Sequence, residues 1–297
     1  MNGVAPRILF ALTVLLLLGG CEQLRNLFAR SPDIHFAPYG AEYQTKPDFA
    51  RLEHEHPLKP EDLIKITPRY LAGLEQEQVD QIYARLTTGP IPDGPFEGDL
   101  FFPKGVSGKA RIAEIVGGGL GTLAVNLKVK KLDLLGEVLW KGKVFYRDEL
   151  VLRNRIEDLV VLKPLIEGDL RDIPKISVNG RDAWLLFPAK LYCGQSLLDS
   201  RRESIIIDYA FSDEIEGYRE RPDFLAGRRG LAVRDEIRMV RPGFYLGRAY
   251  MNRVFALNFT LYNKEIAKRD TEAFAKTGKV KEDCWPAVDQ QLATATR

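Results

Sequence analysis

Short runs of aromatic and β-branched residues dominate the second half of this chain of 297 residues. Turn residues separate several of these runs, which span residues 183–192, 203–211, 235–240, 244–250 and 253–262. In the last run, large apolar residues occupy every second position, so they share one face, while the residues between them share the other. This alternation is typical of a β-strand. Arg241-Pro242-Gly243 predicts a tight hairpin turn between two of the runs. The pattern therefore predicts antiparallel strands.

Earlier segments add two strands and most of the helices. Residues 96–102 and 140–146 are predicted strands. Apolar residues spaced by three and four predict helices over about 67–88 and 120–139, and another is expected over 264–276. Many short strands with few helices favour a mainly β (α+β) fold. We expect an antiparallel, barrel-like sheet with an N-terminal helical section and a C-terminal helix, since closure removes exposed sheet edges.

The N-terminus has the parts of a secretory signal peptide. Arg7 precedes an apolar run over residues 8–18, followed by Gly19, Gly20 and Cys21. The run is shorter than the roughly 20 residues that a membrane-spanning helix needs. Leu18-Gly19-Gly20-Cys21 resembles the lipobox of bacterial lipoproteins, which implies cleavage before Cys21 and acylation, for example by palmitate, of that cysteine. The alternative is a signal peptide cut elsewhere.

This resemblance also implies a subcellular location and a division of the chain into segments. In lipoproteins of this kind, a residue such as Glu22 beside the lipid directs the protein to the outer membrane, so we expect the periplasmic face of that membrane. Residues 1–20 are the predicted signal peptide. Residues 21–62, rich in proline and charge without a helical or strand period, are a predicted lipidated tether or extended arm. Residues 63–297 are expected to form a single folded domain.

Charge and cysteine content narrow the function classes. The chain carries 43 basic and 41 acidic residues, a balance that gives no electrostatic footprint for nucleic acid. After lipidation of Cys21, only Cys193 and Cys284 remain. In an oxidising compartment these two cysteines predict a disulfide, and the alternative is a pair of unpaired buried thiols.

Three motifs that could carry chemistry are each incomplete. Glu53-His54-Glu55-His56 lacks the histidine spacing of zinc proteases, and residues 117–121 lack the Lys-Ser/Thr ending of a phosphate loop. Cys193 has no nearby base in the sequence, because all three histidines lie in the predicted arm. We therefore predict no catalytic residue, no metal ligand and no cofactor.

Polar residues on the predicted strands are the candidate ligand-binding groups. Inside a barrel, an Arg–Asp pair and tyrosine hydroxyls would orient a ligand head group among apolar walls. The alternative is that these charges face water or form structural ion pairs. The candidates are Asp208, Tyr209, Arg238, Tyr245, Arg248, Tyr250 and Tyr262.

Two segments resemble a group of uncharacterised bacterial envelope proteins. One runs from Ile205-Ile206-Ile207-Asp208-Tyr209 to Gly247-Arg248, and the other is Trp140-Lys141-Gly142-Lys143-Val144-Phe145, a W-x-G-K-x-F marker. This resemblance implies no known activity. The predicted barrel is lipocalin-like by analogy only, because Phe96-Glu97-Gly98 stands where a lipocalin shows G-x-W.

Three functions are compatible with these features. The first is a lipid-anchored envelope protein that binds or carries a small hydrophobic or amphipathic ligand in a barrel pocket. The second is a structural lipoprotein that binds another envelope protein through the arm or a strand edge. The third, ranked last, is an enzyme that uses Asp208, Asp235 or Glu236 as acid or base in a barrel cavity.

Overall fold

The computed structural model describes residues 31–39, 47–105, 140–159, 162–281 and 283–284. The described residues from Ile34 onward belong to one compact unit. Its α-helices are α2 (Phe49–Glu55), α3 (Pro60–Leu63), α4 (Pro68–Gly73), α5 (Gln76–Arg85), α8 (Glu220–Asp223) and α9 (Lys264–Thr277). Its strands are β1 (Gly94–Phe101), β2 (Trp140–Tyr146), β3 (Val151–Ile156), β4 (Lys175–Val178), β5 (Arg181–Gln195), β6 (Glu203–Asp208), β7 (Val233–Arg241), β8 (Phe244–Met251) and β9 (Val254–Tyr262). Short 3-10 turns lie at Lys163–Leu165, Leu170–Asp172 and Ser212–Glu214.

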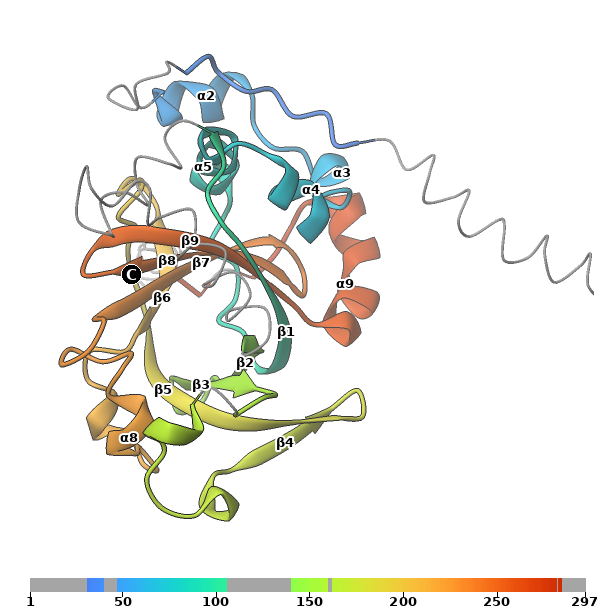
Figure 1. Cartoon of the computed structure of the whole chain (residues 1–297). Coiled ribbons are helices and arrows are strands. Elements are labelled where there is room, and N and C mark those ends of the chain that lie inside the picture. The colour runs from blue at the N-terminus through green and yellow to red at the C-terminus, as the bar shows by residue number, and fades with distance from the viewer. Residues whose placement is uncertain (1–30, 40–46, 106–139, 160–161, 282, 285–297) are drawn as a thin grey trace, which may run out of the picture. The chain divides into compact units, whose positions relative to one another are not determined.

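The strands form a closed antiparallel barrel (Figure 1). Within the described residues, the sheet order is β3-β2-β1-β9-β8-β7-β6-β5-β4, and β3 also pairs with β5. That additional pairing joins the two ends of an eight-stranded ring, while β4 extends from β5 as a hairpin outside it. The predicted fold class, a barrel-like antiparallel sheet with N-terminal helices and a C-terminal helix, is confirmed.

All seven predicted strands are present, and two further strands were not predicted. The hairpin expected at Pro242-Gly243 connects β7 to β8, and Gly243 takes a φ of 73°, which the turn requires. The strands β3 and β4 were missed. Charged residues interrupt β3 in the sequence, as in Arg153-Asn154-Arg155, yet their backbone completes the ring. The helix expected over 120–139 lies outside the described residues.

The helix predicted over about 67–88 is two helices. Thr67 caps α4 as expected, because its hydroxyl accepts a hydrogen bond from Tyr70 N at 3.1 Å. The backbone is extended at Leu74 and Glu75, which ends α4. A capping box then starts α5, in which Gln78 Oε1 accepts a hydrogen bond from Glu75 N at 3.0 Å. This second capping signal, a Glu followed three residues later by a Gln, indicates the start of a new helix, which the spacing of apolar residues alone does not reveal.

The segment expected to be an extended arm is partly helical. Residues 49–55 and 60–63 form α2 and α3, and Phe49 and Leu52 are buried. Asp48 caps α2 by accepting from Ala50 N and Arg51 N. Helices this short show little periodicity in sequence, so their stability comes from tertiary contacts rather than from propensity.

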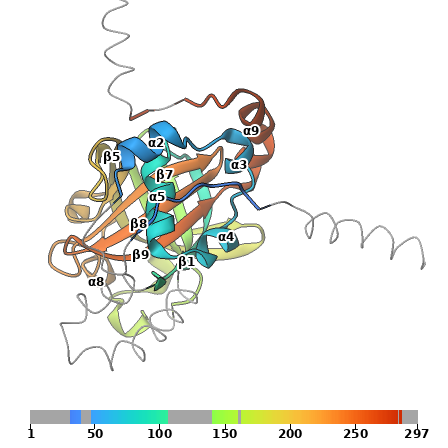
Figure 2. The same cartoon turned by 90° about the horizontal axis from the view of Figure 1, so that it is seen from above.

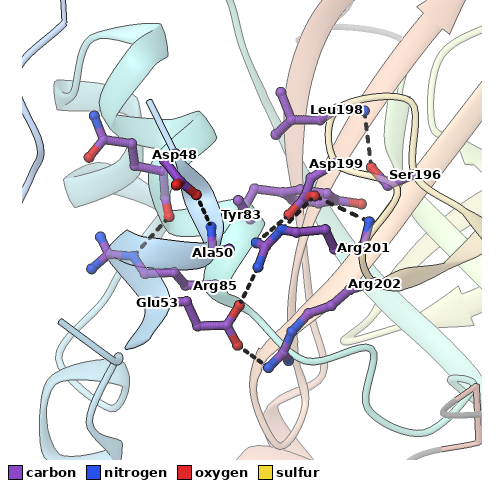
Figure 3. A network of polar contacts seen from close by, with 12 residues as sticks. Asp48, Ala50, Glu53, Tyr83, Arg85, Ser196, Leu198, Asp199, Arg201 and Arg202 are labelled. Carbon is purple, nitrogen blue, oxygen red and sulfur yellow. Dashed lines mark hydrogen bonds and ion pairs between the residues drawn. The ribbon is translucent and has the colours of Figure 1, made fainter. Parts of the chain in front are cut away.

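A polar network attaches α2 to the loop between β5 and β6 (Figure 3). Glu53 forms ion pairs with Arg201, at 3.1 Å, and with Arg202, and Asp199 holds Arg201 in place at 2.6 Å. Arg85 of α5 donates to the carbonyl oxygens of His35 and His56. The described residues of the predicted tether from Ile34 onward thus belong to the folded unit.

The N-terminal helices cover the outer face of β7, β8 and β9, with α5 lying across these strands (Figure 2). An apolar layer fills the interface, and it includes the predicted helix residues Leu71, Val79, Ile82, Tyr83 and Leu86 together with Val240, Phe244 and Leu246 from the barrel. A second core fills the barrel interior. No described helix is both long enough and apolar enough to cross a membrane.

A disulfide joins Cys193 on β5 to Cys284, with the two Cα atoms 5.2 Å apart. This is the pairing predicted from the cysteine count. Next to it, Asp283 accepts a hydrogen bond from Ile91 N at 2.8 Å and donates from its own backbone to Gly89 O. The segment after α9 is therefore fastened to the barrel at several points.

Replacing both cysteines, as Cys193→Ser with Cys284→Ser, should lower the free energy of unfolding. The bridge spans 91 residues of sequence, and closing a loop of this length restricts the unfolded chain, so we expect a loss of about 2–4 kcal/mol. Chemical denaturation followed by circular dichroism measures it. Under reducing conditions the wild type should match the variant, and equal stabilities without reductant would contradict the prediction.

Candidate functional site

The middle of the barrel is a packed core. Interior positions on successive strands carry large side chains that are almost fully buried. They include Phe96, Phe145, Leu152, Leu191, Ile205, Ile207, Ile237, Met239, Phe259 and Leu261. The candidate sites therefore lie towards the two ends of this core, one polar and enclosed, the other open.

At one end, four polar side chains from four parts of the sheet meet inside the barrel. Lys143 Nζ donates hydrogen bonds to Asn154 Oδ1 at 2.9 Å, Tyr209 Oη at 2.7 Å and Asp235 Oδ2 at 2.9 Å. The side chains of Lys143 and Asp235 are 3% and 6% exposed. All three protons of the ammonium group thus have an acceptor, which a buried lysine requires.

The amide of Asn154 is held from both sides. Its Oδ1 also accepts from Trp140 Nε1 at 2.8 Å, while its Nδ2 donates to Phe187 O at 2.9 Å and to Tyr209 Oη at 3.0 Å. Since an indole N–H can only donate and a carbonyl oxygen can only accept, these partners define which amide atom is oxygen. We call Trp140, Lys143, Asn154, Tyr209 and Asp235 the buried lysine cluster.

An irregularity in β2 turns Trp140 and Lys143 to the same side. The register with β3 shifts between these two residues, and Gly142 between them has a φ of 126°. A Cβ at position 142 would lie 2.0 Å from Phe96 O, so only glycine fits. The W-x-G-K-x-F marker therefore encodes this bulge and two members of the buried lysine cluster.

Aromatic rings and burial determine the charges in this cluster. Lys143 Nζ lies 5.4 Å from the ring centroids of Trp140, Tyr209 and Phe259. Burial by itself lowers the pKa of Lys143, but the Asp235 carboxylate and the Tyr209 hydroxyl outweigh it, so the pKa is raised. Burial raises the pKa of Tyr209 to about 12. The resting state is a lysine–aspartate ion pair beside a neutral phenol.

A second polar network lies on the outer face of the barrel, beneath α5. Arg248 forms a buried ion pair with Asp80 and donates to Tyr250 Oη at 3.0 Å. Burial opposes the charge on Arg248, yet Asp80 and Tyr250 outweigh it and raise its pKa. Nearby, the amides of Gln76 and Asn258 exchange two hydrogen bonds. These contacts fasten α5 to β8 and β9.

Arg238 makes its bonds with uncharged oxygens. Its guanidinium donates to backbone carbonyls at the end of α5, such as Tyr83 O at 3.0 Å, to Arg202 O at 2.8 Å and to the Ser204 hydroxyl at 3.0 Å. Burial lowers the pKa of Arg238. This arrangement joins the helix end to the loop before β6, which is a structural role.

The seven predicted ligand-binding residues are not brought together. Tyr209 and Tyr245 face the barrel interior, and the strand register places them near opposite ends of β7. The side chains of Arg238, Arg248 and Tyr250 are buried on the outer face, and Tyr262 packs there against Phe244. Asp208 accepts from Tyr192 on the outer surface. Arg248 instead forms a structural ion pair, which was the stated alternative to a ligand-binding role.

The other end of the barrel opens into a cavity of about 660 Å³ that α9 borders. Three interior side chains, Phe96, Met239 and Tyr245, reach it from the core. Charged residues surround them, and of the predicted candidates Tyr245 lines this cavity. The other lining residues are Pro90, Pro92, Asp93, Arg147, Pro242, Gly243, Asn263, Glu265, Ile266, Arg269, Asp270, Ala273, Phe274, Lys279, Val280 and Lys281.

Two residues of the histidine-rich motif contact other side chains. Glu53 binds arginines, as described above, and the ring of His56 stacks on that of His35 with centroids 3.7 Å apart. Across the described part of the chain, no group of three or more His, Cys, Asp or Glu side chains is placed to hold a metal ion.

Sequence reasoning named the marker around Lys143 but gave it no role. The sequence pattern indicates Asp235 as a polar strand residue and a candidate acid or base, and it gives no indication of a site role for Asn154. The sequence signal for this cluster is Lys143, a lysine among the apolar residues of a predicted strand. A lysine that is buried there needs a carboxylate partner, which predicts an acidic residue on a neighbouring strand.

Comparisons with known proteins assign no activity to this chain. No family model matches it, and no curated protein matches it. One solved structure, described as "Crystal structure of protein from Thermomonospora curvata", is 15% identical and covers 64% of this chain and 88% of that chain, with a TM-score of 0.34.

The Arg248–Asp80 pair should behave as a buried ion pair. Arg248→Met leaves the Asp80 carboxylate buried without its guanidinium, so we expect a loss of about 3–5 kcal/mol in the free energy of unfolding. Adding Asp80→Leu should recover most of this loss, because no buried charge then remains. Urea denaturation of both single variants and the double variant measures the coupling. Losses that simply add would rule out the pairing.

Proposed function

We propose that this protein is a lipid-anchored envelope protein that binds a small amphipathic molecule at the open end of its barrel. The observation that carries the proposal is the cavity of about 660 Å³ between the barrel and α9. Its size falls within the roughly 300–1,000 Å³ typical of small-molecule sites. A closed barrel with a hollow at one end is an architecture that can hold such a ligand.

The floor of the cavity suits the apolar part of a ligand. Phe96, Met239 and Tyr245 come from the barrel core, and Ile266 and Phe274 come from α9. The Tyr245 hydroxyl donates to Pro90 O at 2.6 Å, so the ring presents its apolar face while its polar atom is already bonded. Burial also raises the pKa of Tyr245, which keeps the hydroxyl neutral.

The rim suits a polar or acidic head group. Arg269 pairs with Asp270 at 2.8 Å, and Lys281 pairs with Asp283 at 3.0 Å. Arg147 donates to Ile91 O, but its buried Nε has no hydrogen-bond partner within the described residues. A carboxylate or phosphate oxygen in the cavity would supply that missing acceptor.

Two features support the envelope location. The first is the lipobox-like segment that ends at Cys21, with Glu22 behind it. The second is the disulfide between Cys193 and Cys284, since disulfides persist in oxidising compartments such as the periplasm. An anchored protein with an amphipath-sized cavity is suited to hold a lipid-like molecule beside the membrane.

Filling the cavity should weaken ligand binding. Ala273 is exposed on α9 and lines the hollow, so Ala273→Trp should weaken the binding of a fluorescent fatty-acid analogue at least about tenfold, or 1.4 kcal/mol. Lys276→Trp is the matched control, because Lys276 lies on the same helix and is not a lining residue. Titration of detergent-extracted full chain measures both affinities. Equal affinities in all three proteins would reject the cavity as the site.

The anchor is tested separately. In a bacterial host with an outer membrane, Cys21→Ser should shift the full chain out of the outer-membrane fraction, because the acylated thiol is lost. The variant with Cys193→Ser and Cys284→Ser should stay in that fraction, since it keeps Cys21. Fractionation with mass analysis of the N-terminal peptide detects the lipid. A Cys21→Ser protein that remained with the outer membrane would refute the anchor.

A further inference from the structure

We propose that the buried lysine cluster forms a covalent cross-link, an amide bond between the Lys143 side chain and the Asn154 side chain. No outside enzyme is needed, because the cluster supplies every group that the reaction requires. The proposal is independent of the ligand cavity and of the lipid anchor.

The nucleophile and the electrophile are already in contact. Lys143 on β2 and Asn154 on β3 are directly paired in the sheet, and Lys143 Nζ lies 2.9 Å from Asn154 Oδ1. The carbonyl carbon Cγ is bonded to that oxygen, so the amine attacks it after the lysine side chain rotates and moves Nζ from the oxygen to the face of the amide. Holding both groups on paired strands removes most of the entropic cost of bringing them together.

The amide of Asn154 is polarised towards attack. Trp140 Nε1 donates to Oδ1 at 2.8 Å, which withdraws electron density from Cγ and would stabilise the oxyanion formed on attack. The opposite side of the amide is held by Phe187 O, which accepts from Nδ2 at 2.9 Å. The amide plane therefore cannot rotate away from the amine without losing both bonds.

Asp235 can carry the proton. A proton passes from Lys143 Nζ to Asp235 Oδ2 along their 2.9 Å hydrogen bond, which leaves a neutral amine and a neutral acid. The ion pair is the resting form, and this transfer gives the neutral pair from which the amine reacts; burial lowers the cost of the transfer because it removes two charges from a low-dielectric interior. The amine then attacks Cγ to give a tetrahedral intermediate with the negative charge on Oδ1.

Collapse of the intermediate releases ammonia. Nδ2 gains a proton from Asp235 through Tyr209 Oη, which lies 3.0 Å from Nδ2 and 3.4 Å from Asp235 Oδ2. The Cγ–Nδ2 bond breaks, the Cγ–Nζ bond remains, and the Nζ proton returns to the Asp235 carboxylate. One ammonia leaves, Asp235 ends as it was in the neutral pair, and no electrons are gained or lost.

A tryptic digest of the purified full chain tests the cross-link. Trypsin cannot cut after an acylated lysine, so residues 142–147 should remain in one peptide, joined through Lys143 to the dipeptide Asn154-Arg155. Mass spectrometry should show this branched peptide about 17 Da below the sum of the two separate peptides, a difference equal to the mass of the released ammonia. Recovery of an uncross-linked, cleaved Lys143 and an intact or deamidated Asn154 would overturn the proposal.

Two variants separate chemistry from folding. Asp235→Asn keeps the side-chain volume but cannot carry the proton, so the branched peptide should be lost. Asp182→Asn changes an exposed carboxylate on β5 and should retain it in full. A branched peptide of wild-type abundance in Asp235→Asn would overturn the role of Asp235. If that variant does not fold, the wild-type digest alone decides whether the bond exists.

Discussion

The pairing of β3 with β5 is the constraint on which the rest of this structure depends. It converts a nine-stranded sheet with two open ends into a ring with β4 outside it. Closure gives each strand of the ring one face towards an enclosed interior, where Phe96, Phe145 and Phe259 can pack. It also holds Asn154 of β3 beside Phe187 of β5, which orients the amide at the centre of the buried lysine cluster.

The sequence predicted the class of fold because its signals are local. Alternation in residues 253–262 and the turn at Pro242-Gly243 reflect the strand period and backbone sterics, and both features are present in the structure. Alternation could not tell which face points inward. In β7 and β8 both faces are buried, one by the barrel core and the other by α5, so apolar and charged positions such as Ile237 and Arg238 are equally enclosed.

The candidate sites were harder to predict because their members are distant in sequence. Lys143 and Asp235 are 92 residues apart, and Arg248 and Asp80 are 168 apart. Charged residues of both signs on neighbouring strands suggested a ligand pocket. In the structure, α5 supplies the partners of Arg238 and Arg248. That layer was itself underestimated, since α2 and α3 are too short to give a periodic pattern.

The position of β8 has a consequence for how this molecule opens. Its residues from Phe244 to Tyr250 are all buried, and β7 and β9 bond to its two edges. An amide proton there can exchange with solvent only after a neighbouring strand separates and the helical layer lifts. The hairpin strand β4 pairs with β5 along one edge, and within the described residues no strand pairs with its other edge. Hydrogen exchange should therefore be slowest in β8, where it reports global unfolding, and fast in β4, where it reports local fraying.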